Sequence, residues 1–268
     1  MTTLTLTPLL ASGALQFAFD KATTEGKVCI GCLIVVSLFS WTVIITKARQ
    51  LLRARAVAKK FFAAYRSTRD PLEMFRKGAD FDGAPAFEVY HNAAEELSYH
   101  LKQSPVHVKG HTKISPTSFD SVRVTLERSV GAEALSLEKG MIVLSTAVAG
   151  GPFIGLLGTV WGVMETFSGI ARANAASLTA MAPGVAGALI ATVVGLFVAI
   201  PAMFAYNFMV TSIRGITQEL DNFASEFMTQ IEHKYVDTRP LAEELTAALQ
   251  AVERRQFRPE LEESSIPN

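Results

Sequence analysis

Three predominantly apolar stretches in the body of this sequence contain no Asp, Glu, Lys, Arg or His. They are Val28–Thr46 with 19 residues, Gly140–Met164 with 25 residues and Ala173–Ile213 with 41 residues. A helix needs about 20 consecutive apolar residues to cross a bilayer core, whereas apolar runs of about 10–14 residues are typical of helices buried in soluble proteins. Each stretch therefore predicts one membrane span.

The third stretch is longer than one span but too short for two spans and a turn. Its first part, 173–183, reads "ANAASLTAMAP" and is rich in small, weakly apolar residues, so we expect a loop there. Proline is favoured in the first turn of a helix. The third span is therefore expected to begin near Pro183.

Basic residues set the expected orientation across the membrane. Six of them follow the first stretch with no acid in between: Lys47, Arg49, Arg53, Arg55, Lys59 and Lys60. The positive-inside rule places that side in the cytoplasm, so the N-terminus faces outward and the C-terminus inward. Residues 1–19 contain no Lys or Arg, so no cleavable signal peptide is expected.

These boundaries divide the chain into eight expected segments. They are an outward-facing N-terminal segment (1–27), the first span (28–46), a cytoplasmic helical domain (47–139), the second span (140–164), an outward loop (165–182), the third span (183–210), a cytoplasmic helical extension (211–236) and a C-terminal tail (237–268). The predicted fold is an all-α membrane protein with three transmembrane helices and long cytoplasmic helical extensions.

Apolar residues at helical spacing continue through the cytoplasmic segments. Helices are predicted at 49–67, at 86–104, at 118–140 running directly into the second span, and at 183–235, where Pro201 can introduce a kink. Glycine and proline interrupt the helices at 78–85. Residues 105–118, "PVHVKGHTKISPTS", are predicted to form a loop, and a short amphipathic helix is expected at 241–255.

The side chains of these segments do not indicate an enzyme, a metal site or a cofactor. The sequence shows no phosphate-binding glycine loop and no nucleophile triad, and its 25 acidic and 25 basic residues give no sign of a nucleic-acid partner. Cys29 and Cys32 form a C-x-x-C, but metal sites need four ligands, so we interpret them as small apolar residues. His107 and His111 are interpreted as surface residues because glycine and proline spoil a helix there.

Small residues recur along one face of each of the last two spans. They are Ala147, Gly151, Gly155, Gly158 and Gly162 in the second span, and Gly184, Ala188, Ala191, Gly195, Ala199 and Ala202 in the third. Such residues let membrane helices approach closely. The stripes fit a tight antiparallel hairpin within one chain, or an oligomer or partner groove. Two stripes on neighbouring helices slightly favour the second arrangement.

Thr159 and Thr192 lie beside these stripes. A hydroxyl in a membrane helix usually bonds back to the carbonyl four residues earlier. The alternative is a polar point on a hydrated path.

Two long strings carry a family resemblance. "PFIGLLGTVWGVMETFSGIA" at 152–171 and "MAPGVAGALIATVVGLFVAIPAMFAYN" at 181–207 closely resemble the TolQ/ExbB family, which also includes the more distant flagellar stator subunit MotA. "LEKG" at 137–140 also resembles family sequence. "DNFASEF" at 221–227 resembles TolQ more than ExbB, which gives a slight lean to TolQ.

The resemblance implies a multi-pass protein of the bacterial inner membrane, with a periplasmic N-terminus and a cytoplasmic C-terminus. Such proteins form pentamers, and hence a homo-oligomeric helical bundle, around a dimer of a single-span TolR- or ExbD-like partner whose membrane aspartate carries the proton. Thr159 and Thr192 match threonines of the polar lining. The motor energises work in the periplasm or at the outer membrane.

One departure from the family pattern concerns a carboxylate. The third span of the family usually reads A-P-G-[IV]-A-E-A-L, whereas this chain reads "APGVAGAL" with Gly187 in place of the acid. Glu165 is about 9 Å outward from Thr159, and Gly187 is about 7.5 Å outward from Thr192, at about 1.5 Å per residue. We therefore hypothesise that Glu165 replaces the missing carboxylate. The alternative is a solvated residue that pairs with Arg172.

A proton path needs a titratable group, and the apolar stretches at 140–164 and 173–213 supply none. Moving a charge through 100 mV releases about 2.3 kcal/mol, so a partner must bring that group into the membrane if protons flow. The competing interpretation is a membrane scaffold or signalling subunit of the same fold that conducts nothing. The missing acid at Gly187 is its best argument.

Overall fold

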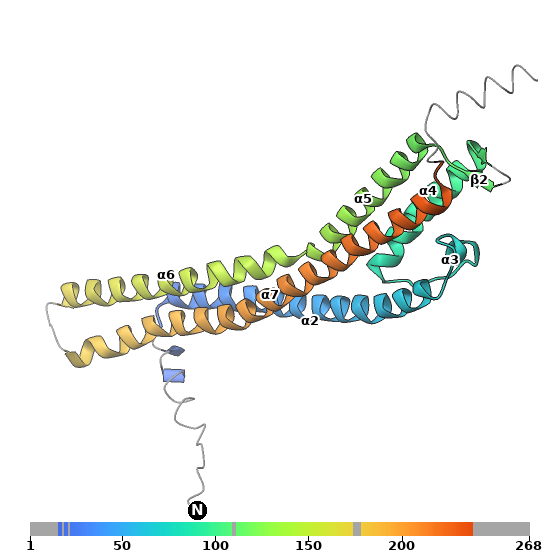
Figure 1. The fold of residues 1–268 in the computed structure, drawn as a ribbon. Helices are drawn as coiled ribbons and strands as arrows, with labels where there is room; N and C mark the ends of the chain where they lie inside the picture. The colour runs from blue at the N-terminus through green and yellow to red at the C-terminus, as the bar shows by residue number, and fades with distance from the viewer. Residues whose placement is uncertain (1–15, 18, 21, 109–110, 174–177, 238–268) are drawn as a thin grey trace, which may run out of the picture. The chain divides into compact units, whose positions relative to one another are not determined.

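The computed structural model describes residues 16–17, 19–20, 22–108, 111–173 and 178–237. Its labelled elements are α2 (Thr24–Arg66), α3 (Glu73–Arg76), α4 (Pro85–Gln103), β1 (Val106–Val108), β2 (His111–Lys113), α5 (Pro116–Glu138), α6 (Met141–Ala173) and α7 (Leu178–Tyr235) (Figure 1). They fall into two compact units. The first takes its described residues from Met1–Ala63, Phe81–Phe87 and Val130–Asp221, and the second from Ala64–Asp80, Glu88–Ser129 and Asn222–Asn268.

Three helices are long and apolar enough to cross a membrane. They lie at Thr24–Arg66, Met141–Arg172 and Met181–Tyr235, which confirms the predicted all-α membrane fold. Large apolar side chains on all three point away from the protein interior: Leu38 is 65% exposed on α2, Phe153 71% on α6 and Phe197 79% on α7. Such exposure is expected where lipid, rather than water, surrounds the helices.

Within the first unit, α6 and α7 run side by side in opposite directions (Figure 1), and their small residues face each other. A Cβ atom at Gly151 would lie 3.1 Å from the carbonyl oxygen of Gly195, and one at Gly162 would lie 2.7 Å from the Cβ of Ala188. The two stripes therefore pack against each other within one chain. This packing is the hairpin alternative, whereas the oligomer or partner groove remains a prediction.

Helix α2 packs against this pair near its own N-terminal end. Ile30 shares a buried apolar cluster with Ile190 and Ala191 of α7. A Cβ atom at Gly158 of α6 would lie 3.4 Å from the Cβ of Cys29. The three membrane helices thus contact one another where Gly158 faces α2.

The helix before the second span does not run directly into it. Helix α5 ends at Glu138, and Gly140 adopts a φ of 87°, in the left-handed region that favours glycine, before α6 starts at Met141. The prediction of one uninterrupted helix was wrong because Gly140 offers the chain a conformation that ends a helix.

The expected loop at 165–182 is largely helical. Helix α6 continues to Ala173, and α7 already begins at Leu178, before Pro183. The sequence between Leu178 and Pro183, "LTAMA", is rich in the strongest helix formers, and this preference outweighs the proline signal for a helix start. The predicted end of the third helix near Tyr235 is confirmed, whereas the sidedness of all segments remains a prediction.

The second unit contains a small sheet where the sequence predicted a loop. Strands β1 and β2 pair antiparallel, with His107 opposite Thr112. β-Branched residues at 106, 108 and 112 favour extended backbone, which the loop prediction overlooked. Beyond β2, Ile114 forms a parallel bridge with Val236, and the Ile114 N–H donates to the carbonyl of Tyr235 at 2.7 Å.

Aromatic side chains form the core of the second unit. The ring of Tyr65 lies 5.2 Å from that of Phe223 and 5.7 Å from that of Tyr90, and Tyr90 lies 5.3 Å from Phe227. Edge-to-face pairs at such distances add stability beyond the burial of apolar area. The predicted short helix at 241–255 and the C-terminal tail after Asp237 lie outside the described residues.

Candidate functional site

The predicted polar residues Thr159 and Thr192 meet between α6 and α7. Their hydroxyl oxygens are hydrogen-bonded to each other, and both side chains are half-buried. The meeting depends on Gly155, because a Cβ atom there would lie 2.9 Å from the Cα of Thr192 and 2.8 Å from the carbonyl oxygen of Ala191. A larger residue at 155 would push the two backbones apart.

The hydrogen bonds of this pair form a short chain. The Thr159 hydroxyl lies 3.1 Å from the carbonyl oxygen of Gly155 and 3.4 Å from that of Ala188. Each hydroxyl has one proton to donate and can accept as well. When Thr192 donates to Thr159, the Thr159 proton goes to a backbone carbonyl. The pair therefore combines the ordinary bond to the i−4 carbonyl with a contact between helices.

The close packing continues outward from the threonine pair. Gly162 faces Ala188, and the Thr166 side chain fills the space in front of Gly184. The Thr166 hydroxyl donates to the carbonyl of Gly162 at 2.8 Å. The predicted packing residues on both helices are thus brought together, and they fix the register of α6 against α7.

Glu165 and Gly187 lie at similar depths but do not meet. With Gly162 opposite Ala188 and Thr166 opposite Gly184, Glu165 lies about two residues, or about 3 Å, from the level of Gly187. Gly187 is buried and Glu165 is exposed. Among the described residues, no ion pair joins Glu165 to Arg172 or to another residue.

The direction of Glu165 differs from that of the threonine pair. Seven residues, about two helical turns, separate Gly158 from Glu165, so both project from the same side of α6. A Cβ atom at Gly158 would lie 2.6 Å from the Cβ of Ala191 of α7 and 3.4 Å from the Cβ of Cys29 of α2. Thr159 is turned by about 100° from Gly158 and meets Thr192. In depth Glu165 fits the hypothesis of a replacement carboxylate, whereas in direction it is turned by about 120° around α6 from Thr159.

The cysteines and histidines have surroundings that differ from those of metal ligands. Both cysteines are free thiols, and Cys29 packs against Gly158 as a small side chain. His107 is exposed, and the side chain of His111 lies outside the described residues. No group of three or more His, Cys, Asp or Glu residues is placed to hold a metal ion in the described parts of the chain.

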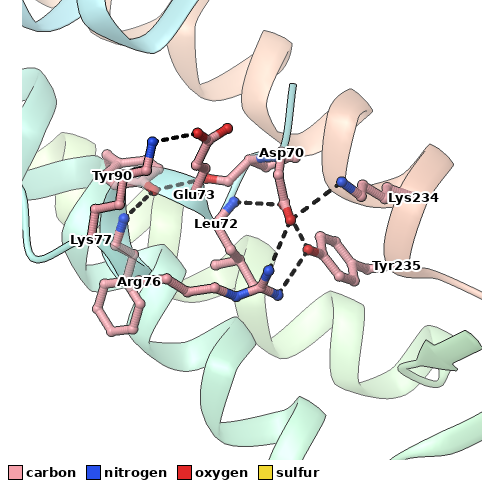
Figure 2. Close-up of polar contacts among 10 residues, drawn as sticks. Asp70, Leu72, Glu73, Arg76, Lys77, Tyr90, Lys234 and Tyr235 are labelled. Carbon is pink, nitrogen blue, oxygen red and sulfur yellow. Dashed lines mark hydrogen bonds and ion pairs between the residues drawn. The ribbon is translucent and has the colours of Figure 1, made fainter. Parts of the chain in front are cut away.

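A second polar cluster, in the second unit, surrounds Asp70 (Figure 2). The Tyr235 hydroxyl donates to Asp70 Oδ1 at 2.6 Å, and the Leu72 N–H donates to the same oxygen at 3.0 Å. Arg76 lies 2.9 Å and Lys234 3.3 Å from Oδ2. The carboxylate therefore ties the C-terminal end of α7 to the turn before α3.

Burial and hydrogen bonds act in opposite directions on Asp70. Burial alone raises the pKa of the carboxyl group, but the bonds from Tyr235, the Leu72 N–H and Lys234 outweigh it and hold the pKa below its ordinary value. The same neighbourhood raises the pKa of Tyr235, through burial and then through its bond to Asp70. The ionised Asp70 and the neutral Tyr235 are thus the favoured partners.

Tyr90 completes the polar contacts of this cluster. Its hydroxyl donates to the carbonyl of Pro71 at 2.8 Å and accepts from the Phe75 N–H at 3.0 Å. Burial raises the pKa of Tyr90 to about 12. The bond from the Phe75 N–H opposes this increase, and the negative charge of Asp70 adds to it. The fully buried phenol therefore stays neutral at physiological pH.

Three residues, Lys47, Asp70 and Thr166, have roles that sequence reasoning missed. Lys47 was interpreted only as a sign of orientation, whereas its side chain also bonds the carbonyls of Ser136 and Leu137 in α5. An aspartate whose side chain accepts the N–H two residues later is a known turn signal, so the Asp70–Leu72 contact could have been found. The fit of Thr166 against Gly184 required the register of two helices.

Three apolar helices, two of them packed backbone to backbone around a hydroxyl pair, define a helical membrane protein. The profile of the MotA/TolQ/ExbB proton channel family matches residues 94–222. The chain is 34% identical to the Tol-Pal system protein TolQ of Haemophilus influenzae, over 83% of this chain and 95% of that protein. It belongs to the MotA/TolQ/ExbB proton channel family.

Other relatives carry both names of this family. The chain is 31% identical to the Tol-Pal system protein TolQ of Pseudomonas aeruginosa, over 77% of this chain and 87% of that protein. It is 32% identical to the biopolymer transport protein ExbB of Pseudomonas putida, over 78% of this chain but only 61% of that protein. The predicted family and its lean toward TolQ are consistent with these relatives.

Proposed function

We propose that this protein is an inner-membrane subunit of a motor driven by the proton-motive force. As a homo-oligomer, a pentamer by its resemblance to the family, it forms a channel around a dimer of a single-span TolR- or ExbD-like partner. The motor energises a process in the periplasm or at the outer membrane. Membership of the proton channel family supports the class, and the TolQ relatives support a Tol-Pal role.

The hydroxyl pair of Thr159 and Thr192 is the observation that carries the proposal. It is a polar contact inside two apolar helices, and Gly155 lets the two backbones come close enough for it to form. Polar groups at membrane depth are costly and commonly mark ion pathways. Each hydroxyl can accept and donate a hydrogen bond, but neither titrates at physiological pH.

A titratable group must therefore come from another chain. The apolar stretches of α6 and α7 between Gly140 and Met164, and between Ala173 and Ile213, contain no Asp, Glu, Lys, Arg or His. A carboxyl group on a single-span partner would be solvated by the threonine hydroxyls when it passes their level. This division of labour gives the partner the proton and gives this chain the polar lining.

A non-conducting scaffold is the second candidate function. The observation that favours it is Gly187, a buried glycine where the family carries an acid. A scaffold would keep the packed α6–α7 pair and its partner. Its function would not change when the threonine hydroxyls are removed. The two functions thus differ in what the threonines must do.

The test replaces the hydroxyls by methyl groups of the same shape. We expect Thr159→Val and Thr192→Val, expressed with the partner, to lower proton-driven activity by about tenfold or more, since each removes a polar contact in an apolar layer. Thr159→Ser should retain most activity. The matched control is Thr146→Val on the same helix, where the hydroxyl is exposed and bonds only to its i−4 carbonyl at 2.8 Å.

Native mass spectrometry of the complex distinguishes loss of conduction from loss of assembly. The proposal requires that the valine variants keep the subunit and partner numbers of the wild type. If they also keep proton-driven activity, the conducting function is wrong and the scaffold is favoured. Absence of any single-span partner from the purified complex would contradict both the channel and the motor assignments.

A further inference from the structure

Lys47 is a buried lysine without a carboxylate partner among the residues described. Its side chain follows directly after the first apolar stretch, and the residue is only 8% exposed. The ammonium group donates to the carbonyl of Leu137 at 3.0 Å, to that of Ser136 at 3.3 Å and to Gln50 Oε1 at 2.9 Å. These three contacts use all three donors of the group.

Two of the acceptors belong to the last turn of α5. A helix leaves its final carbonyl groups without intrahelical N–H partners, and its C-terminal end carries a partial negative charge. Helix α5 ends at Glu138, and Gly140 turns the chain before α6. Lys47 of α2 therefore caps α5 from another helix and supplies the positive charge that its C-terminal end favours.

The same lysine touches the start of the second span. A Cβ atom at Gly140 would lie 3.9 Å from Lys47 Cε, which is ordinary contact. At the other end of the pair, Cys29 of α2 faces Gly158 of α6. Eighteen residues separate Cys29 from Lys47, and eighteen separate Gly140 from Gly158.

The equal spacing defines a register between two antiparallel helices. Eighteen residues of helix span about 27 Å, close to the roughly 30 Å of a bilayer core. The contacts at Lys47 and at Cys29 therefore lie about one apolar layer apart. Apolar packing between them is non-directional, whereas the hydrogen bonds of Lys47 require a defined position of the end of α5.

We propose that Lys47 is a positioning residue that fixes the depth of α6 in the membrane by capping α5. It sets where the chain turns at Gly140, and thereby the level of every residue of the second span. Thr159 follows Gly158 directly, so its depth depends on the same register. This last step rests on the proposed function, whereas the register itself does not.

The first experiment measures hydrogen exchange at the turn in the full-length protein in lipid nanodiscs. The backbone N–H of Lys139 donates to the carbonyl of Leu135 at 3.1 Å, and that of Val143 donates to the carbonyl of Gly140 at 3.2 Å. Exchange of these two amides therefore reports on the turn. Lys47→Met keeps the side-chain length but removes all three bonds. We expect these amides to exchange about tenfold faster or more, the effect of losing hydrogen bonds to a charged group.

Two variants provide the comparison. Lys47→Arg keeps a positive donor group and should restore exchange to within about threefold of the wild type, because it can still bond the α5 carbonyls. Lys60→Met removes an exposed lysine from the same helix and should leave exchange unchanged. Equal exchange in Lys47→Met and Lys60→Met would overturn the proposal.

The second experiment measures the depth of α6 directly. Trp161 is 44% exposed, two residues after Thr159, and in a Trp41→Phe background it is the only tryptophan. Lipids brominated at different depths quench the fluorescence of Trp161 according to its depth. The depth of strongest quenching should shift in Lys47→Met and not in Lys47→Arg. An unchanged depth profile in Lys47→Met would contradict the role in positioning α6.

A folding failure of Lys47→Met does not leave the question open. Lys47→Gln keeps a neutral amide donor but loses the charge and part of the reach of the ammonium group, so it should accelerate exchange at the turn to a smaller extent. Wild-type exchange in Lys47→Gln would then overturn the proposal. Neither readout needs proton flow, so Lys47 can be confirmed as the capping residue even if Thr159→Val refutes the proposed function.

Discussion

The backbone of Gly155 lies against that of Thr192, so close that a Cβ atom on the glycine would stand 2.9 Å from the threonine Cα. The Ala191 carbonyl oxygen would lie 2.8 Å from the same Cβ atom. Both atoms that a side chain at 155 would meet thus belong to the backbone of α7. Neither can move without shifting a whole helix. The contact that brings the two hydroxyls together therefore depends on the absence of one side chain.

Gly155→Ala should destabilise the protein by about 1–3 kcal/mol, the usual cost of overfilling a packed interface. The control is Gly150→Ala on the same helix, where nothing lies within 4 Å of a Cβ atom. That change should be neutral or stabilising by up to about 1 kcal/mol, because alanine favours helix. Thermal unfolding of both variants in detergent checks this, and equal shifts would contradict the packing of α6 on α7.

Asp70→Asn should destabilise the second unit by about 1–3 kcal/mol, the cost of breaking hydrogen bonds to a charged group. The matched control is Asp82→Asn. Asp82 pairs with Arg53 at 3.0 Å, but the side chains are 80% and 65% exposed, so its removal should cost less than about 1 kcal/mol. Chemical unfolding followed by circular dichroism measures both. Equal losses would show that the cluster in Figure 2 adds no more than a surface ion pair.

The contribution of Asp70 to the free energy of unfolding should also depend on pH. Hydrogen bonds hold the folded pKa of Asp70 below its ordinary value, so its stabilisation is present above the unfolded pKa of about 3.9. It is lost as the pH falls below that value through the folded pKa. The stability difference between wild type and Asp70→Asn should therefore be constant at neutral pH and shrink in acid. A difference that grows in acid would have the wrong sign.

Tyr90 should make the second unit sensitive to alkali. Burial raises the pKa of Tyr90 to about 12, so its contribution is complete below the unfolded pKa of about 10 and is lost as the pH rises toward about 12. Tyr90→Phe should cost about 1–3 kcal/mol at neutral pH, because Pro71 and Phe75 lose their partner, and should flatten this alkaline loss. Tyr99→Phe, at an exposed tyrosine, should change neither.

The exposed position of Glu165, turned away from the threonine pair, predicts a small effect of its removal. Glu165→Gln should change proton-driven activity by less than about twofold, as expected for a solvated surface residue. The readout is the proton-driven activity that is also measured for Thr159→Val. A loss as large as that of Thr159→Val would instead establish Glu165 as the carboxylate that replaces the acid missing at Gly187.

The three spans could be predicted because charge-free stretches long enough to cross a bilayer are rare in helices that water surrounds. The ends of the helices were harder to predict from the sequence. Gly140 ends α5 through a left-handed backbone conformation, and Leu178 starts α7 ahead of a proline, because local backbone preferences compete there with the pattern of charges. The short sheet at His107 and Thr112 was not predicted because three-residue strands carry almost no periodic signal.

The candidate site could be predicted only in part. The stripes of small residues and the resemblance pointed to Thr159 and Thr192, but the register that joins them depends on which backbone atoms face each glycine. The contacts of Lys47 with α5, and of Asp70 with Tyr235, join residues about 90 and 165 positions apart. No spacing rule along one chain connects such residues.

The glycine and alanine contacts between α6 and α7 also have a mechanical consequence. Apart from three threonines, the contacts described between α6 and α7 come from glycine and alanine, which have no rotamers, so little strain can be absorbed by repacking. The two helices should therefore move as one stiff element. The turn at Gly140, where Lys47 holds the end of α5, would pass any displacement of that element on to α5.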